Sequence, residues 1–274
     1  MVEIFLILLA PFIGGLVYGV ERIVRARMQN RIGPPLLQPF YDMYKLMDKE
    51  PFIVNNTHII FGILHFLSLW LCVALLILGQ NLLYIIFIHL LSSIFLILAG
   101  FSVKSIYSHI GANRELLTLL AYEPILMLIA AAFYMTNGSF YTDLIRQSES
   151  MIMPLFLLFL AFLLIIPIKL KKSPFDAAEA HQEIVGGVEI EYSGIFFEFL
   201  YMAKWIEYIF IYLLLLLFAG DNILLGVSLC AIVFLLLNLV DNSTARIKIQ
   251  NLLRVVVGIG FTFGVLNILG LAYV

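Results

Sequence analysis

The chain has 274 residues, of which 63% are hydrophobic and only 12% are charged, and its mean hydropathy is +1.06. A soluble domain carries about twice that share of charged residues, so the composition excludes a soluble globular protein and indicates a polytopic membrane protein. The net charge of −2, without a basic patch interleaved with aromatic residues, gives no indication of nucleic-acid binding. Cys72 and Cys230 lie far apart in apolar runs, so we expect this chain to ligate neither zinc nor an iron–sulfur cluster.

Eight apolar runs are long enough to cross the hydrocarbon core of a bilayer. They occupy 2–20, 59–79, 82–100, 116–135, 152–169, 196–219, 222–240 and 252–273. The first run has neither a basic leader nor a small-residue cleavage site, so we interpret it as a retained span rather than a signal peptide. The sequence therefore predicts an all-α fold, a single membrane domain over 1–274 with about eight transmembrane helices.

Basic residues are concentrated in the loops that follow the first, third, fifth and seventh predicted spans. These loops are 21–58, 101–115, 170–195 and 241–251, whereas the opposite loops contain only Arg146 as a basic residue. Loops rich in lysine and arginine stay on the cytoplasmic side of a membrane. We therefore predict that the four loops are cytoplasmic and that both termini are outside.

The first cytoplasmic loop contains a turn signal followed by an amphipathic segment. The stretch Arg31-Ile32-Gly33-Pro34-Pro35 must turn, because glycine and paired prolines break both helix and strand. After it, apolar residues recur at helical spacing, namely Leu37, Phe40, Tyr41, Tyr44 and Met47. This pattern predicts an amphipathic helix over 37–49, either in the membrane interface or packed on other cytosolic parts.

Acidic side chains also lie inside predicted spans. The fourth span carries Glu123, with Arg114 and Glu115 at its cytoplasmic mouth, and the sixth span carries Glu198. A charge at membrane depth is costly. We therefore expect these carboxyl groups to face a polar interior or a water-filled cavity.

The sixth span also carries Lys204 and Glu207, and two other spans carry histidines. Lys204 and Glu207 are three residues apart, so we expect them to pair on one helix face. We interpret His65 and His89 as hydrogen-bonded packing residues rather than ligands or site residues.

The segment 173–194 is an island of carboxylates in an otherwise apolar chain. Ser173, Pro174 and Asp176 are typical of a helix N-terminus, and Gly186-Gly187 is typical of a helix end. In such a helix Asp176, Glu179 and Glu183 would share one face. The plain structural alternative is a short solvated helix at the membrane surface.

Three segments resemble the NuoH/ND1 family of respiratory complex I membrane subunits. The first combines Glu21-Arg22 with Arg27-Met28-Gln29-Asn30-Arg31-Ile32-Gly33-Pro34-Pro35-Leu36-Leu37-Gln38-Pro39-Phe40-Tyr41-Asp42 and Lys45-Leu46. The second combines Arg114-Glu115 with Tyr122-Glu123, and the third combines Ser173-Pro174-Phe175-Asp176 with Glu179-Ala180, Gln182-Glu183 and Glu191-Tyr192-Ser193. The likeness covers most of the chain.

Three departures from the quinone-reducing members resemble another branch of that family. The glycine-containing insert between the Gly-Pro and Leu-Gln-Pro motifs is missing from Gly33–Pro39, His181 lies in the Ala-His-Gln-Glu segment, and Asp241-Asn242 is followed by Arg246. These features are similar to the equivalent subunit of membrane-bound, energy-converting nickel–iron hydrogenases and of their formate-hydrogenlyase and sulfur-reducing relatives.

The resemblance implies a membrane subunit, not itself catalytic, that docks a peripheral redox arm and couples its electron transfer to H⁺ or Na⁺ translocation. The implied ion-translocation and coupling residues are Glu115, Glu123, Asp176, Glu179, Glu183, Glu191, Glu198, Lys204 and Glu207. The implied docking residues are Arg27, Arg31, Gly33, Pro34, Pro35, Gln38, Asp42, Lys45, His181, Tyr192 and Arg246.

The resemblance also implies where the redox chemistry lies. We expect no metal or redox cofactor on this chain, with iron–sulfur clusters and a nickel–iron centre in peripheral partner subunits. Antiporter-like membrane subunits would be further partners, in the cytoplasmic membrane of a prokaryote. Two alternatives stay open: a quinone-binding subunit of a complex I-type NADH or ferredoxin dehydrogenase, and a passive membrane anchor.

Overall fold

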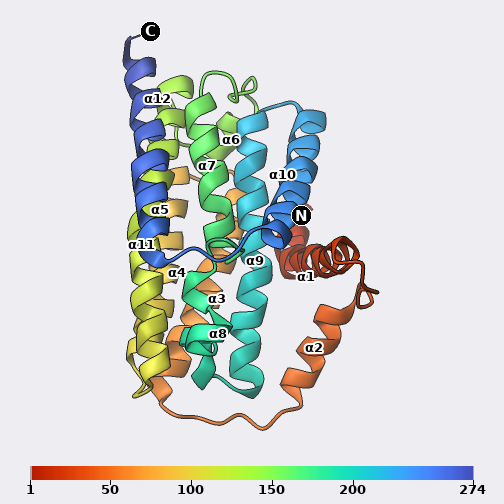
Figure 1. Cartoon of the computed structure of the whole chain (residues 1–274). Helices are drawn as coiled ribbons and strands as arrows, with labels where there is room; N and C mark the ends of the chain where they lie inside the picture. The colour runs from red at the N-terminus through yellow and green to blue at the C-terminus, as the bar shows by residue number, and fades with distance from the viewer. Residues whose placement is uncertain (1, 274) are drawn as a thin grey trace.

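The computed structural model describes residues 2–273, which form a bundle of helices without a β-sheet (Figure 1). Seven helical spans are long and apolar enough to cross a membrane. They are α1 (Val2–Met28), α3 (Asn56–Ile77), α4 (Leu82–Phe101), α5 (Ile106–Asn137), α9 (Gly194–Ala219), α10 (Ile223–Ser243) and a last span made of α11 (Ile249–Val255), the π-helical stretch η3 (Val256–Phe261) and α12 (Thr262–Tyr273). The prediction of an all-α polytopic membrane protein is confirmed.

The remaining predicted span corresponds to α7 (Phe156–Lys169), which has only 14 residues. At a rise of about 1.5 Å per residue it is roughly 21 Å long, shorter than the hydrocarbon core of about 30 Å. The helix starts later than predicted because Pro154 disfavours helical backbone at the residue before it. The count of eight spans and the placement of the termini outside stay predictions.

Asparagine side chains begin three of the spans. Asn55 accepts a hydrogen bond from the Thr57 N–H at 3.0 Å, and Asn81 accepts one from the Leu83 N–H at 2.9 Å. Asn222 accepts a hydrogen bond from the Leu225 N–H at 3.0 Å at the start of α10. Each contact satisfies a backbone donor that has no partner inside its own helix.

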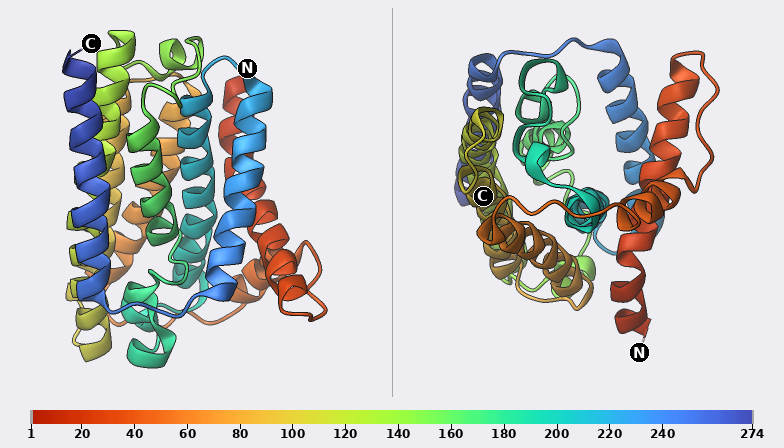
Figure 2. Two further views of the ribbon diagram at one scale, coloured as in Figure 1. Left: turned by 45° about the horizontal axis from the view of Figure 1, so that its top comes forward. Right: turned by 90° about the horizontal axis from the view of Figure 1, so that it is seen from below.

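Helix α9 is the central helix of the bundle and packs against α1, α3 and α10. Helix α1 crosses the bundle at a steep angle and is seen almost end-on in Figure 1 and side-on in the right panel of Figure 2. Its Gly14 and Gly15 lie directly against Trp205 of α9. The missing side chains let the two helix backbones approach closely, which positions the middle of α1 beside the middle of α9.

The predicted amphipathic helix is present as α2 (Gln38–Met47). Phe40 contacts Phe12 of α1 and Trp205 of α9, with ring centroids 6.3 and 5.4 Å apart. Tyr41 and Tyr44 are exposed. One face of α2 therefore packs on the bundle and the other remains open.

The expected single helix between Ser173 and Gly186 is wrong. The structure has three short pieces instead: η1 (Ala177–Glu179), α8 (His181–Ile184) and η2 (Gly187–Glu191). The backbone of this segment binds other elements, since the Pro174 carbonyl accepts the Ile247 N–H at 3.0 Å and the Ala177 carbonyl accepts an Arg114 N–H at 2.8 Å. Tertiary hydrogen bonds outweigh the local helix signals, and the acids do not share one helix face.

Candidate functional site

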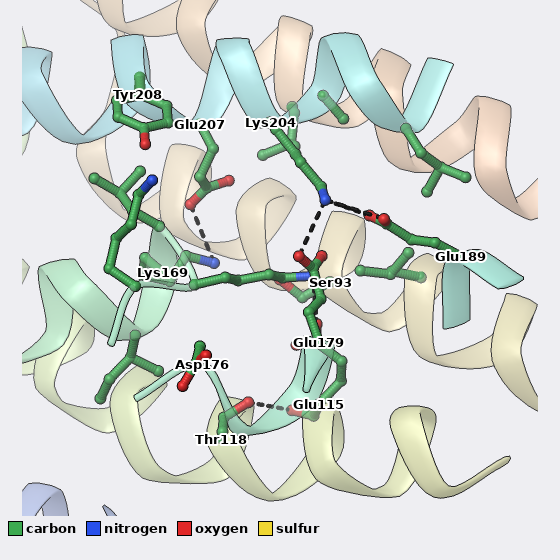
Figure 3. Close-up of a pocket in the computed structure, with 18 of the residues that line it drawn as sticks. Ser93, Glu115, Thr118, Lys169, Asp176, Glu179, Glu189, Lys204, Glu207 and Tyr208 are labelled. Atoms are coloured by element: carbon green, nitrogen blue, oxygen red, sulfur yellow. Dashed lines mark hydrogen bonds and ion pairs between the residues drawn. The ribbon is translucent and has the colours of Figure 1, made fainter. Parts of the chain in front are cut away.

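A polar cavity of about 290 Å³ lies where the end of α7 and the segment 170–193 meet α4, α5 and α9 (Figure 3). Figure 3 shows acidic and basic side chains from several elements pointing toward one another around it. The charged residues that line it are Arg25, Glu115, Lys169, Lys171, Lys172, Asp176, Glu179, Glu189, Lys204, Glu207 and Asp241.

The Lys-Leu-Lys-Lys sequence at the end of α7 supplies a cation to each of three carboxylate clusters. Lys169 pairs with Glu207, Lys171 with Glu115 and Glu179, and Lys172 with Glu21. The helix ends at Lys169, and Lys171 adopts a left-handed backbone conformation with φ of 51°. The chain turns at this point, so successive lysines point into different clusters.

The first cluster, which we call the loop cluster, contains Glu115, Lys171, Glu179, Glu189 and Lys204. Lys171 Nζ lies 2.5 Å from Glu115 and 2.6 Å from Glu179, and Lys204 Nζ lies 3.0 Å from Glu179 and 2.9 Å from Glu189. Three carboxyl groups thus share two ammonium groups. Like charges held close together at a buried site disfavour full ionisation.

The carboxyl groups of the loop cluster differ in proton affinity. Burial raises the pKa of Glu179, but Lys171 and Lys204 outweigh it and hold that pKa well below its ordinary value. Burial and the Glu179 carboxylate raise the pKa of Glu189 to about 7, against the opposing effect of Lys204. Burial disfavours a charge on Lys171, yet Glu115 and Glu179 keep its pKa well above the usual range. Because the acids interact, they titrate as a coupled group.

The second cluster, which we call the inner cluster, contains Tyr122, Lys169, Glu207, His89 and Glu123 and lies within the spans. Lys169 Nζ lies 3.2 Å from Glu207 and donates to the Tyr122 hydroxyl at 3.0 Å. His89 Nε2 lies 3.1 Å from Glu207, and His89 Nδ1 lies 4.0 Å from Glu123. The inner cluster extends the polar region from the cavity into α4 and α5.

The third cluster joins α1 to the cavity. Glu21 is buried and pairs with Lys172, while the Tyr208 hydroxyl donates a hydrogen bond to the same carboxylate. The rings of Tyr18 and Tyr208 lie about 6 Å from the Lys172 ammonium group. A carboxylate from the first span is therefore fully paired in the interior.

Ion pairs also tie the outer edge of the cavity together. Arg246 donates to both carboxylate oxygens of Asp176, at 2.9 and 2.6 Å, and lies 3.8 Å from Glu183. Arg114 pairs with Glu183 at 2.7 Å. A bidentate arginine–carboxylate contact fixes orientation as well as charge, so this edge holds α5, the 173–185 segment and the α10–α11 loop in register.

The structure brings together six of the nine predicted coupling residues around the cavity and its edge: Glu115, Asp176, Glu179, Glu183, Lys204 and Glu207. Glu123 lies 4.0 Å from His89, whose other ring nitrogen lies 3.1 Å from Glu207. Glu191 and Glu198 do not line the cavity. Glu198 is 1% exposed, and within residues 2–273 neither of its carboxyl oxygens has a hydrogen-bond partner.

The expected pairing of Lys204 with Glu207 is wrong. Lys204 points to Glu179 and Glu189, and Glu207 points to Lys169 and His89. Their spacing on α9 allows a contact, but each finds a partner on another element. This separates the two residues into the loop cluster and the inner cluster.

Several residues of these clusters are not among the predicted site residues, namely Glu21, His89, Lys169, Lys171, Lys172 and Glu189. The interpretation of His89 as packing alone is incomplete, because its hydrogen-bond partner is a carboxylate. A lysine tract directly after an apolar helix was the available signal for the three cations. Glu189 lies inside the acidic island between Glu183 and Glu191.

The predicted docking residues divide into exposed and buried ones. Arg27, Arg31, Lys45 and His181 are exposed. Asp42 is held by Arg22 at 2.7 Å and by Gln38 at 2.8 Å; burial raises its pKa, but the hydrogen bond from Arg22 outweighs this and lowers it. The Gly33-Pro34-Pro35 turn leads from α1 to α2, and Gly33 lies against Ile23.

Tyr192 does not belong to an exposed docking surface. It is 7% exposed, its hydroxyl donates to the His58 carbonyl at 2.7 Å, and its ring stacks on His58. Arg246 is engaged at the cavity edge by Asp176. Both residues therefore hold the structure together where the sequence predicts contact with a partner.

Residues 2–273 contain no group of three or more His, Cys, Asp or Glu side chains arranged to hold a metal ion. The clusters combine carboxylates with lysines, which compensate the negative charge that a metal ion would otherwise neutralise. Such a set of groups can bind, store and pass protons.

The comparisons with known proteins agree with this architecture. Residues 2–272 match the family model described as NADH dehydrogenase. An NADH-quinone oxidoreductase subunit of Neisseria meningitidis serogroup C (strain 053442) is 32% identical over 227 residues, covering 71% of this chain and 62% of the relative. The NADH-ubiquinone oxidoreductase chain 1 of Mycosarcoma maydis is 31% identical over 208 residues, covering 68% and 63%. The matched part therefore spans less than two thirds of these relatives.

A solved structure has the same fold. It is a chain of the membrane-bound sulfane sulfur reductase, described as an archaeal respiratory membrane complex. The TM-score is 0.85 at 24% sequence identity, over 97% of this chain and 98% of that one. The likeness establishes a common helix arrangement.

Proposed function

We propose that this chain, which belongs to the NADH dehydrogenase family of NuoH/ND1 membrane subunits, couples electron transfer in a docked redox arm to ion translocation. It is a membrane subunit of the complex I-like type. In our proposal its partners are a peripheral arm that carries iron–sulfur clusters and a nickel–iron centre, together with antiporter-like membrane subunits. This chain holds no redox centre of its own and lies in a prokaryotic cytoplasmic membrane.

The observation that carries this proposal is a series of ion pairs and hydrogen bonds reaching from the 173–191 segment into the spans. The loop cluster and the inner cluster border one cavity. Their carboxyl groups come from η1, η2, α5 and α9. Buried carboxylates in one polar region respond to a nearby charge by changing their protonation.

The loop cluster is the part that senses the redox arm in our proposal. Its three carboxyl groups and two lysines are balanced when one carboxyl group holds a proton. Burial and Glu179 give that proton to Glu189, whose pKa is about 7. A change of charge in the docked arm would then shift a proton within the cluster, and the cavity would pass this change to Lys169 and Glu207.

The charged cavity lining favours an ion route over a quinone chamber. Pockets for apolar ligands are lined mainly by hydrophobic and aromatic side chains, whereas this cavity is surrounded by ion pairs. The short Gly33–Pro39 loop and the His181 segment also resemble the hydrogenase branch rather than the quinone-reducing members. We therefore infer a hydrogenase-type or sulfur-reducing complex as the setting of this subunit.

Glu123→Gln in the assembled complex tests the coupling role. The variant keeps the size of the side chain but cannot ionise, so we expect ion uptake by membrane vesicles to fall about tenfold or more while electron transfer to a soluble dye persists. The matched control is Glu149→Gln, an exposed carboxyl group in the α6–α7 loop, where α6 is Thr142–Arg146. Wild-type pumping by both Glu123→Gln and Glu207→Gln complexes would refute the route.

The metal and quinone content of the purified complex separates the alternatives. Bound nickel without quinone supports the hydrogenase-type setting, and bound quinone with inhibition by a quinone-site inhibitor supports the complex I-type dehydrogenase. A passive anchor predicts that neutral substitutions in the clusters weaken assembly at high salt but leave the ions moved per electron unchanged.

A further inference from the structure

Two buried polar groups in the inner cluster face each other without hydrogen bonds. His89 Nδ1 and Glu123 Oε2 are 4.0 Å apart. Within residues 2–273 neither this nitrogen nor either oxygen of Glu123 has a hydrogen-bond partner. Buried polar atoms are nearly always paired, so this gap requires an explanation.

The other side of the same imidazole is engaged. His89 Nε2 lies 3.1 Å from Glu207 Oε1, and Lys169 lies 3.2 Å from that oxygen. The ring is fully buried and stacks parallel on Phe210, with centroids 4.5 Å apart and an interplanar angle of 4°. The stack fixes the ring plane, so its two nitrogens point at two different carboxyl groups.

We propose that His89 transfers protons between Glu207 and Glu123. This inference rests on the proposed function and assigns one step of it to one residue. In the forward step, Nδ1 takes the proton of the Glu123 carboxyl group and Nε2 releases its own proton to the Glu207 carboxylate, which is ion-paired with Lys169 in this structure. Glu123 is left ionised, Glu207 is left neutral, and the imidazole changes from one neutral tautomer to the other. The reverse step restores the starting tautomer.

The geometry permits this step after a small movement. The 4.0 Å separation exceeds a hydrogen-bond distance by about 1 Å. No hydrogen bond within residues 2–273 holds the Glu123 carboxyl group in its present place. A shift of that side chain toward His89 completes the connection, and its return breaks it.

His58 provides a matched comparison in the same bundle. It is also buried, its Nδ1 contacts the Ala99 carbonyl at 2.9 Å, its ring lies 3.8 Å from that of Tyr192, and its Nε2 has no partner within residues 2–273. In contrast to His89, its hydrogen-bonded nitrogen faces a backbone carbonyl. Replacement of either histidine removes a buried ring that packs on an aromatic neighbour, but only replacement of His89 removes a group placed between two carboxyl groups.

The test uses two variants of His89 in the assembled complex, each of which keeps a polar group at only one of the two imidazole nitrogen positions. His89→Gln keeps a polar group near Nε2 and His89→Asn keeps one near Nδ1, but neither amide passes a proton. We expect the ions moved per electron to fall about tenfold or more in both variants, with dye reduction retained. His58→Gln is expected to pump as the wild type does.

A second readout separates a relay from a packing effect. In the wild type, a redox cycle should change the infrared absorption of a protonated carboxyl group that Glu123→Gln abolishes. His89→Gln and His89→Asn should lose this change, and His58→Gln should keep it. This readout also applies to complexes that retain only part of their pumping.

The outcomes distinguish this inference from the function on which it rests. Wild-type pumping and an unchanged infrared signal in either His89 variant overturn the relay, and the proposed function stands if Glu123→Gln still abolishes pumping. If Glu123→Gln and Glu207→Gln complexes also pump normally, the proposed function itself fails.

Discussion

Glu189 shows how burial and one neighbour give an ordinary residue a special proton affinity. It lies on η2 with its carboxyl group 2.9 Å from Lys204 Nζ. Lys204 also pairs with Glu179, so one ammonium group neutralises the charge of two carboxyl groups only in part. Because the loop cluster has fewer lysines than carboxyl groups, one carboxyl group is favoured in its protonated form, and that group is Glu189.

This arrangement predicts the pH dependence of stability. The pKa of Glu189 is raised from its ordinary value of 4.5 to about 7 in the folded protein. Its contribution to stability is therefore complete below pH 4.5 and is lost as the pH rises toward 7, on the order of 3 kcal/mol for a shift of this size. Glu189→Gln resembles the protonated form and should remove this loss.

The measurement is the melting temperature of the purified complex between pH 4.5 and 8. We expect wild type and Glu189→Gln to melt at similar temperatures at the acid end, with the wild type falling below the variant toward neutral pH. Glu189→Ala, which lacks the amide, serves as a packing control. Melting curves that stay parallel across this range would contradict the assignment.

At the scale of elements, the contact between α1 and α9 links the predicted docking region after α1 to the buried clusters. Gly14 lies against the backbone of Trp205, and Trp205 is one residue after Lys204. The same helix α1 carries Glu21, which pairs with Lys172. A displacement of α1 would therefore move a buried carboxylate and loosen the contact that locates α9.

Gly14→Ala tests this contact. A Cβ at this position would clash with the Trp205 carbonyl oxygen, which is rigid backbone, so we expect the free energy of unfolding to fall by about 1–3 kcal/mol. Thermal unfolding of the complex in detergent measures it. Gly270→Ala is the control, since a Cβ there meets nothing within 4 Å and alanine favours a helix. Equal melting temperatures for the two variants would contradict a stabilising close contact between α1 and α9 at Gly14.

At the scale of the whole molecule, the exposed basic residues near the end of α1 and the α1–α2 turn form a surface apart from the buried clusters. Arg27 and Arg31 are exposed, whereas Lys169 and Lys171 are enclosed by carboxylates. Exposed charges act mainly through long-range attraction that salt screens. Docking and coupling should therefore respond differently to substitution.

The double variant Arg27→Gln and Arg31→Gln should weaken attachment of the peripheral arm without changing coupling. Loss of two exposed contacts of about 0.5 kcal/mol each lowers the affinity about fivefold at low salt, and the difference from the wild type should shrink at high salt, where the same charges are screened. Retention of the arm on washed membranes at increasing salt measures attachment, and ions moved per electron measure coupling in the retained fraction. Arg254→Gln, an exposed arginine of α11, is the control; equal retention of all three proteins would contradict a docking role.

The amino-acid sequence by itself determined that the chain is a bundle of membrane helices, because apolar runs of span length have no other stable arrangement in a bilayer. It also determined roughly where the helices lie, although α1 continues to Met28 beyond its predicted end at residue 20 and α5 begins at Ile106, well before residue 116. Acidic residues gather in 173–194 and recur inside the spans. These properties depend on local composition, which a sequence records directly.

Only the tertiary structure decided which charges meet. Glu21 and Lys172, or Arg25 and Asp241, are far apart along the chain. Their pairing depends on how α7 ends and how the 173–191 segment turns to satisfy its backbone hydrogen bonds. Ion pairing is set by direction and distance in three dimensions, so spacing along α9 pointed to the wrong partner for Lys204. The same reason explains why His89 becomes a link between carboxyl groups once α4, α5 and α9 are packed together.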